Sequence, residues 1–151
     1  MSYFFYGTLC DPDVLRLVLG YRPSRRQFTP AILTGFRRKI AKGRRYPVLV
    51  PAPAGCIRGL VFQPGRPRDH ERLAAYEGPD YAARRLPVRR LPDHEQAAGR
   101  ACVFVAARSP RGGSCLPADF ADWHPQQWQR RDKRRFLQSL LTQGPVPCAH
   151  P

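Results

Sequence analysis

The sequence predicts an α+β fold, a small mixed β-barrel of about six strands with helices packed outside it. Three observations favour this class. Strand-like segments follow one another at short intervals between residues 28 and 62, with turn residues between them, as in antiparallel hairpins or small barrels. Helical patterns are few and lie near residues 12, 69 and 118. The length of 151 residues, 42% of them hydrophobic, suits one domain with its own core.

The chain opens with an aromatic strand, a sharp turn and a helix. Phe4-Phe5 belongs to an apolar run that predicts a buried strand, and Gly7 permits a tight turn or a close approach to the backbone. Asp11 can cap a helix over residues 12–19, and Gly20 stands where a C-terminal cap belongs. Turns rich in free N–H groups tend to bind carboxylate or phosphate. A purely structural strand-to-helix connection is the alternative.

The middle of the chain is predicted to be rich in strands. Gly59 inside one of them indicates a bulge or a close backbone approach. The expected strands cover residues 28–33, 36–41, 47–50, 56–62, 85–91 and 100–107, with breaks at 34–35, 42–43, 51–55 and 64–65 and with loops at 92–99 and 108–117.

Two further helical regions are expected. One runs from about residue 67 or 69 to Tyr76 and stops at Gly78, which can take a left-handed cap. The other covers about residues 118–143, and Pro125 can open its longer piece. Its apolar stripe, expected to cover the sheet, consists of Trp128, Phe136, Leu137, Leu140 and Leu141. Residues 1–143 are therefore expected to form a single domain, followed by a loose tail over 144–151.

The formal net charge is +15, and arginine supplies most of it. Such a charge favours contact with polyanions through counterion release, so a nucleic-acid partner stays open. The arginine runs are spread over the whole chain, however, and no nucleic-acid-binding motif accompanies them. Arginine on ordinary surfaces is the simpler interpretation.

Other compositional features exclude several classes of protein. The 5 cysteines and 4 histidines are scattered without metal-ligand spacing, so no metal site is expected. No apolar run approaches the roughly 20 residues that span a bilayer, so no membrane contact is expected. The first residues carry no secretory signature, and a cytoplasmic protein is predicted, either a monomer or a small homo-oligomer.

Glu77 is unusual for its place at a predicted helix C-terminus among aromatic residues. The helix dipole disfavours a carboxylate there, and aromatic neighbours would desolvate it and raise its pKa. A residue kept where it does not stabilise the fold is a candidate for function. A solvated surface glutamate before the Gly78 cap is the structural alternative.

Four motifs in this order resemble the gamma-glutamylcyclotransferase-like family, with gamma-glutamylamine cyclotransferase and its short bacterial relatives as the closest branch. The resemblance runs from Tyr3 to about Val105 and extends, more weakly, to a C-terminal helix with tryptophan. The motifs are Tyr6-Gly7-Thr8-Leu9, Tyr46-Pro47-Val48-Leu49-Val50, the glycine-containing strand at 58–62, and Leu-x-x-Tyr-Glu-Gly-x-x-Tyr at 73–81.

The resemblance implies a barrel whose cavity lies between the loop of residues 6–9 and the end of the second helix. Backbone groups of Tyr6, Gly7, Thr8 and Leu9 would hold a γ-glutamyl group, and Glu77 would be the general acid and base. Tyr81 and Arg84 would line the pocket. The implied reaction releases 5-oxoproline and an amine from a small γ-glutamyl amine or peptide, and it needs no metal and no cofactor.

Two alternatives to this function are open at this point. One is a binding module of the same fold, not an enzyme, that uses its basic surface for nucleic acid or an acidic partner. The other is a cysteine hydrolase with Cys10 as nucleophile beside the anion-binding loop, although no histidine shares a motif with that cysteine.

Overall fold

The computed structural model describes residues 1–91 and 98–143, and in them five strands close into a barrel to which a sixth is added. The strand order is β3-β1-β5-β4-β2-β6, and pairing of β2 with β3 closes the barrel. β1 runs parallel to β5, whereas the other pairings are antiparallel. The strands are β1 (Tyr3–Phe5), β2 (Phe28–Ala41), β3 (Pro47–Phe62), β4 (Tyr81–Arg90), β5 (Ala98–Ala106) and β6 (Ala118–Asp122). The predicted fold class is confirmed.

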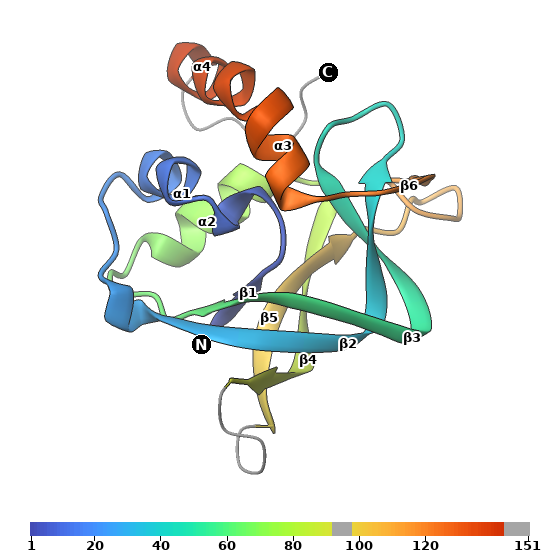
Figure 1. Cartoon of the computed structure of the whole chain (residues 1–151), viewed down its shortest axis with the longest axis horizontal. Helices are drawn as coiled ribbons and strands as arrows, with labels where there is room; N and C mark the ends of the chain where they lie inside the picture. Colours follow the sequence, from blue (N-terminus) through green and yellow to red (C-terminus); the bar gives the residue numbers. More distant parts are fainter. Residues whose placement is uncertain (92–97, 144–151) are drawn as a thin grey trace.

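The helices gather on one side of the barrel (Figure 1). α1 (Pro12–Leu19) and α2 (Asp69–Glu77) pack against each other, and α3 (Pro125–Arg131) and α4 (Lys133–Gln143) lie above them. Two short 3₁₀ turns, η1 (Thr8–Cys10) and η2 (Arg25–Gln27), precede α1 and β2. Over residues 1–91 and 98–143, no helix is long and apolar enough to cross a membrane.

The α1 helix is formed as the sequence predicts. The Asp11 carboxylate accepts hydrogen bonds from the backbone N–H groups of Asp13 and Val14, at 3.0 and 3.3 Å. Gly20 ends the helix in the left-handed conformation, with a φ of 73°. These local signals fix where the chain leaves the turn after β1.

The long hairpin of β2 and β3 differs from the prediction, which divided it into four shorter strands. The break expected at 34–35 is a register shift within β2, where Gly35 takes a φ of 85°. The break expected at 51–55 lies inside β3, and a side chain at Gly55 would collide with the Phe36 carbonyl. The turn residues therefore bend two long strands rather than end them.

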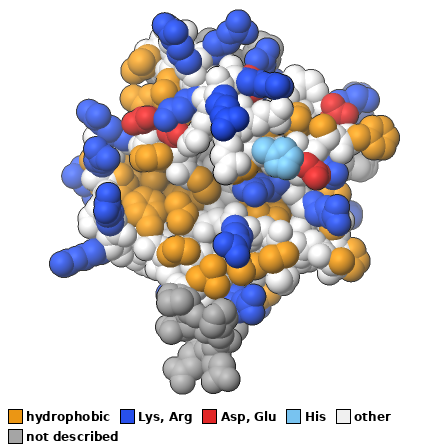
Figure 2. Space-filling view, viewed as in Figure 1, with side chains coloured by type: hydrophobic (Ala, Val, Ile, Leu, Met, Phe, Trp, Pro, Cys, Tyr) orange, Lys and Arg blue, Asp and Glu red, His pale blue; other side chains and the backbone are white. Residues whose placement is uncertain are grey.

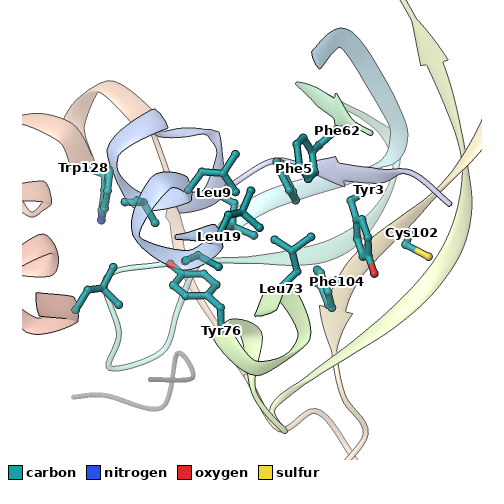
Figure 3. Close-up of a cluster of buried hydrophobic side chains, with 14 of the residues drawn as sticks. Tyr3, Phe5, Leu9, Leu19, Phe62, Leu73, Tyr76, Cys102, Phe104 and Trp128 are labelled. Carbon is teal, nitrogen blue, oxygen red and sulfur yellow. The ribbon is translucent and has the colours of Figure 1, made fainter. Parts of the chain in front are cut away.

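Two hydrophobic clusters lie on the two faces of the barrel wall. Phe4 and Tyr6 belong to the cluster inside the barrel. Tyr3 and Phe5, on the opposite face of the wall, pack with the helices (Figure 3). Gly59 of β3 lets β1 come close, because a Cβ there would meet the Phe5 carbonyl and the Phe4 ring. The predicted close backbone approach is confirmed, and it sets the position of the chain just before the turn.

The C-terminal part corrects three predictions. Residues 118–122, expected to be helical, form β6, and its pairing with β2 continues the sheet. α4 packs over α1 rather than directly on the sheet, and Leu141 is 68% exposed instead of lying in the apolar stripe. Trp128 and Leu140 are buried as predicted, and α3 begins at Pro125. The predicted tail over 144–151 and most of the predicted 92–99 loop lie outside the described residues.

Candidate active site

A small pocket lies at the end of the barrel where β1 and β5 finish and where β3 and β4 begin. Its free volume is about 20 Å³, enough for about one water molecule. Four separate segments supply the lining, so the pocket exists only in the folded chain. The lining residues are Phe4 to Leu9, Tyr46, Pro47, Glu77, Tyr81 and Phe104.

The loop after β1 forms because Gly7 has no side chain. A Cβ at this position would stand 2.7 Å from Cγ of Pro47, closer than real Cβ contacts come. The loop then winds into the 3₁₀ turn, where the N–H of Cys10 donates to the Gly7 carbonyl at 3.0 Å. The first N–H groups of a helical turn have no carbonyl partner within it. The loop thus brings backbone donors to the pocket wall.

Arg38 of β2 holds the start of this loop by a hydrogen bond. Its guanidinium donates to the Tyr6 carbonyl at 3.0 Å and stacks over the Trp123 ring, 5.9 Å from the centroid. Burial lowers the pKa of Arg38 from its usual value. The Tyr6 hydroxyl donates to the Phe104 carbonyl of β5. Tyr6 is therefore held by its backbone carbonyl from β2 and by its side chain from β5.

One hydrogen bond joins the loop to the helix that carries Glu77. The hydroxyls of Thr8 and Tyr76 lie 2.7 Å apart, and both residues are buried. Since Tyr76 directly precedes Glu77, this bond fixes the loop and the end of α2 relative to each other.

Glu77 is the last residue of α2 and lines the pocket. Gly78 ends the helix as predicted, but with a φ of 73° and a ψ of −175° it takes an extended conformation with positive φ instead of the expected left-handed cap, and it turns the chain toward β4. Burial raises the pKa of the Glu77 carboxyl to about 8, because the surrounding protein disfavours the charged form. A carboxyl with this pKa holds and releases a proton near neutral pH.

Six of the seven site residues expected from the sequence line this pocket: Tyr6, Gly7, Thr8, Leu9, Glu77 and Tyr81. The Tyr81 hydroxyl donates to the Pro47 carbonyl at 2.8 Å. Arg84 is exposed and lines a second, larger cavity instead. Five lining residues were left out of the site prediction: Tyr46, Pro47, Phe104 and the β1 residues Phe4 and Phe5. The first two lie in a motif that carried the resemblance, whereas nothing in the sequence around Phe104 indicates its place.

The chemistry of Cys10 disfavours the cysteine-hydrolase alternative. Burial raises the pKa of its thiol to about 12, although the charge of Arg38 opposes this shift. The nucleophilic thiolate is therefore scarce near neutral pH. No group of three or more metal-ligating side chains occurs in the part of the chain that the structure describes.

Basic side chains do not gather into one patch on the face shown in Figure 2. Lysine and arginine lie at separate places along the top and both sides of the molecule and on the face itself, with hydrophobic areas between them. This distribution matches the scattered arginine runs of the sequence.

The protein is thus a small closed barrel of five strands, and its pocket contains one acidic residue at the end of a helix. The model of the family described as "Gamma-glutamyl cyclotransferase, AIG2-like" matches residues 3–125. The chain belongs to this family, as its resemblance predicted.

Named relatives and solved structures agree with this assignment. "AIG2-like protein A" of Arabidopsis thaliana is 29% identical over 137 residues, which cover 91% of this chain and 77% of the relative. A solution structure of an Arabidopsis thaliana protein is 27% identical with a TM-score of 0.60, covering 92% of this chain and 87% of that one. A structure named "Gamma-glutamyl cyclotransferase" is 12% identical with a TM-score of 0.51, covering 93% of this chain and 86% of that one, and it supports the fold alone.

Proposed function

We propose that this protein is a γ-glutamyl cyclotransferase that converts a small γ-glutamyl amine or peptide into 5-oxoproline and a free amine. One observation carries the proposal. Glu77, with its pKa raised to about 8, shares a pocket with the backbone loop of residues 6–9. Membership in the family described as gamma-glutamyl cyclotransferase, AIG2-like, supports the same chemistry.

The loop is the part that would bind the γ-glutamyl end of the substrate. The N–H groups of Gly7, Thr8 and Leu9 are suited to the α-carboxylate, since backbone donors at a turn favour an anion. With a free volume of about 20 Å³, the empty pocket is smaller than this group. Substrate entry therefore requires the side chains around the pocket to move outward.

The reaction needs only a folded substrate and the movement of one proton from the attacking nitrogen to the leaving nitrogen. The substrate's α-amine attacks its own γ-carbonyl, so a new C–N bond closes the five-membered lactam. The old bond from the γ-carbonyl to the leaving amine then breaks. Glu77 as carboxylate takes the proton from the attacking amine and gives it to the leaving nitrogen. Because the nucleophile is tethered to its target, holding the chain in the attacking conformer supplies much of the acceleration.

The proposal is tested by incubating the purified protein with γ-glutamyl compounds and measuring 5-oxoproline by mass spectrometry. The panel contains γ-glutamyl methylamide, γ-glutamyl alanine, γ-glutamyl phenylalanine and γ-glutamyl-ε-lysine. We expect release from at least one of them by the natural protein and a large loss in Glu77→Gln. Release from none would refute the activity. Tight, steeply salt-dependent binding to unspecific RNA or DNA would then favour the binding-module alternative.

A further inference from the structure

A second cavity opens at the same end of the barrel and has a very different size and lining. Its volume is about 550 Å³, within the range of cavities that hold small organic ligands. Its walls are mostly apolar, and Leu49, Leu86 and Val105 come from the inner face of the barrel. Residues 113, 114 and 116–118 close one side. We refer to this cavity as the barrel mouth.

Two tyrosines that line the small pocket also pack against residues of the barrel mouth. Tyr46 and Tyr81 line the pocket, and their ring centroids are 6.3 Å apart. Both pack in one cluster with Val48 and Leu116, which line the mouth. A substrate whose γ-glutamyl end lies in the pocket would therefore direct its other end past these rings toward the mouth.

The charged side chains of the barrel mouth are both arginines, Arg84 and Arg108. Both are exposed, and within the described residues no carboxylate lies within ion-pair distance of either one. Arg108 is held on a tight hairpin, because it forms a β-bridge with Ser114. Among the described residues, the lining of the mouth thus combines apolar walls with two cationic groups and contains no acidic side chain.

We propose that the barrel mouth binds the leaving portion of the substrate and selects an apolar amino acid or short peptide with a free carboxylate. This inference rests on the proposed cyclotransferase function. The apolar side chain of the leaving group would contact the inner barrel wall, and its carboxylate would pair with Arg84 and Arg108. The charge complementarity favours this occupant over a neutral or cationic amine.

A matched pair of substrates isolates the carboxylate. γ-Glutamyl phenylalanine and γ-glutamyl phenethylamine have the same aromatic leaving side chain, but only the first carries the carboxylate. We expect the natural protein to prefer γ-glutamyl phenylalanine in kcat/KM by about five- to tenfold, the size expected of exposed charge pairs. Arg84→Met and Arg108→Met should reduce this preference, mainly by raising KM for γ-glutamyl phenylalanine.

Arg85→Met is the matched control, because Arg85 is the exposed neighbour of Arg84 on β4 and does not line the mouth. Leu86→Trp tests the apolar wall by narrowing the mouth. It should slow turnover of γ-glutamyl phenylalanine more than that of γ-glutamyl methylamide, whose turnover also shows that the variant is folded.

The outcomes separate the two proposals. If γ-glutamyl methylamide is turned over, two results would overturn the assignment of the mouth. One is equal kcat/KM for the two matched substrates, and the other is a preference for γ-glutamyl phenylalanine that survives both arginine substitutions. Failure to release 5-oxoproline from every substrate would overturn the cyclotransferase function, and the assignment of the mouth with it.

Discussion

The small pocket and the barrel mouth lie at the same end of one barrel, yet they differ in nearly every property that governs binding. The pocket has a free volume of about 20 Å³ and contains one carboxyl with a pKa of about 8. The mouth has about 550 Å³, apolar walls and two arginines. A narrow site held by hydrogen bonds suits the part of a substrate that is always the same. A wide apolar site suits the part that varies.

The largest effect is expected at Glu77. We predict that Glu77→Gln lowers kcat/KM for a turned-over γ-glutamyl substrate by about 10²- to 10⁴-fold, the usual contribution of a general acid–base group. Steady-state release of 5-oxoproline measures this. Glu71→Gln, an exposed glutamate of the same helix, should keep the activity of the natural protein. Full turnover by a folded Glu77→Gln protein would show that Glu77 is not the general acid–base group.

Gly7→Ala should cause the second-largest loss of activity. The new Cβ would stand 2.7 Å from Cγ of Pro47, so the loop or the start of β3 must shift. Misplacement of a binding loop by such an amount costs on the order of 10²-fold in kcat/KM. Gly99→Ala is the matched control, since nothing lies within 4 Å of its Cβ position. Similar kcat/KM values for Gly7→Ala and Gly99→Ala would show that the loop accommodates the new side chain without loss of activity.

The raised pKa of Glu77 predicts how stability depends on pH. The native state keeps the proton up to about pH 8, whereas the unfolded chain loses it near 4.5, the ordinary pKa of a glutamate side chain. The free energy of unfolding of the natural protein should therefore fall, relative to Glu77→Gln, as the pH rises between these two values. Relative to Glu77→Gln, the natural protein should lose about 1–4 kcal/mol of stability between pH 4.5 and pH 8.5. Urea unfolding of both proteins at pH 4.5, 6.5 and 8.5 measures this loss. A constant difference across these pH values would contradict an elevated pKa.

The smallest effect is expected at the bond that joins the two halves of the pocket. Removing either hydroxyl, by Thr8→Val or Tyr76→Phe, should cost about 1 kcal/mol of stability and a few-fold in kcat. The double variant should cost less than the sum of the two single variants, because they remove the same interaction. Strict additivity in kcat would mean that this bond does not align the loop with Glu77.

The sequence predicted best where the structural signals are local. The Asp11 cap and the Gly20 terminus fix α1 through groups within a few residues, and both were found. The hairpin was harder, because glycine and proline mark bulges as well as turns. Only the partner strand decides between a bulge at Gly35 and the end of a strand.

Long-range pairing explains the remaining differences. All five side chains of β6 are exposed, so no alternation of apolar residues marked it, and its conformation comes from pairing with β2. Arg84 is close to Tyr81 in sequence, but three residues along a strand carry it to another cavity. Phe104 reaches the pocket through the register of β5 with β4, which no local pattern encodes.

Binding of 5-oxoproline, the proposed product, tests most directly whether the loop and Glu77 are two halves of one site. In an NMR titration we predict saturable shifts of the backbone amides of Gly7, Thr8 and Leu9. The Glu77 carboxyl should respond in the same titration, and Gly7→Ala should weaken the binding. Shifts confined to other regions, or none at saturating ligand in the natural protein, would contradict the assignment of this pocket.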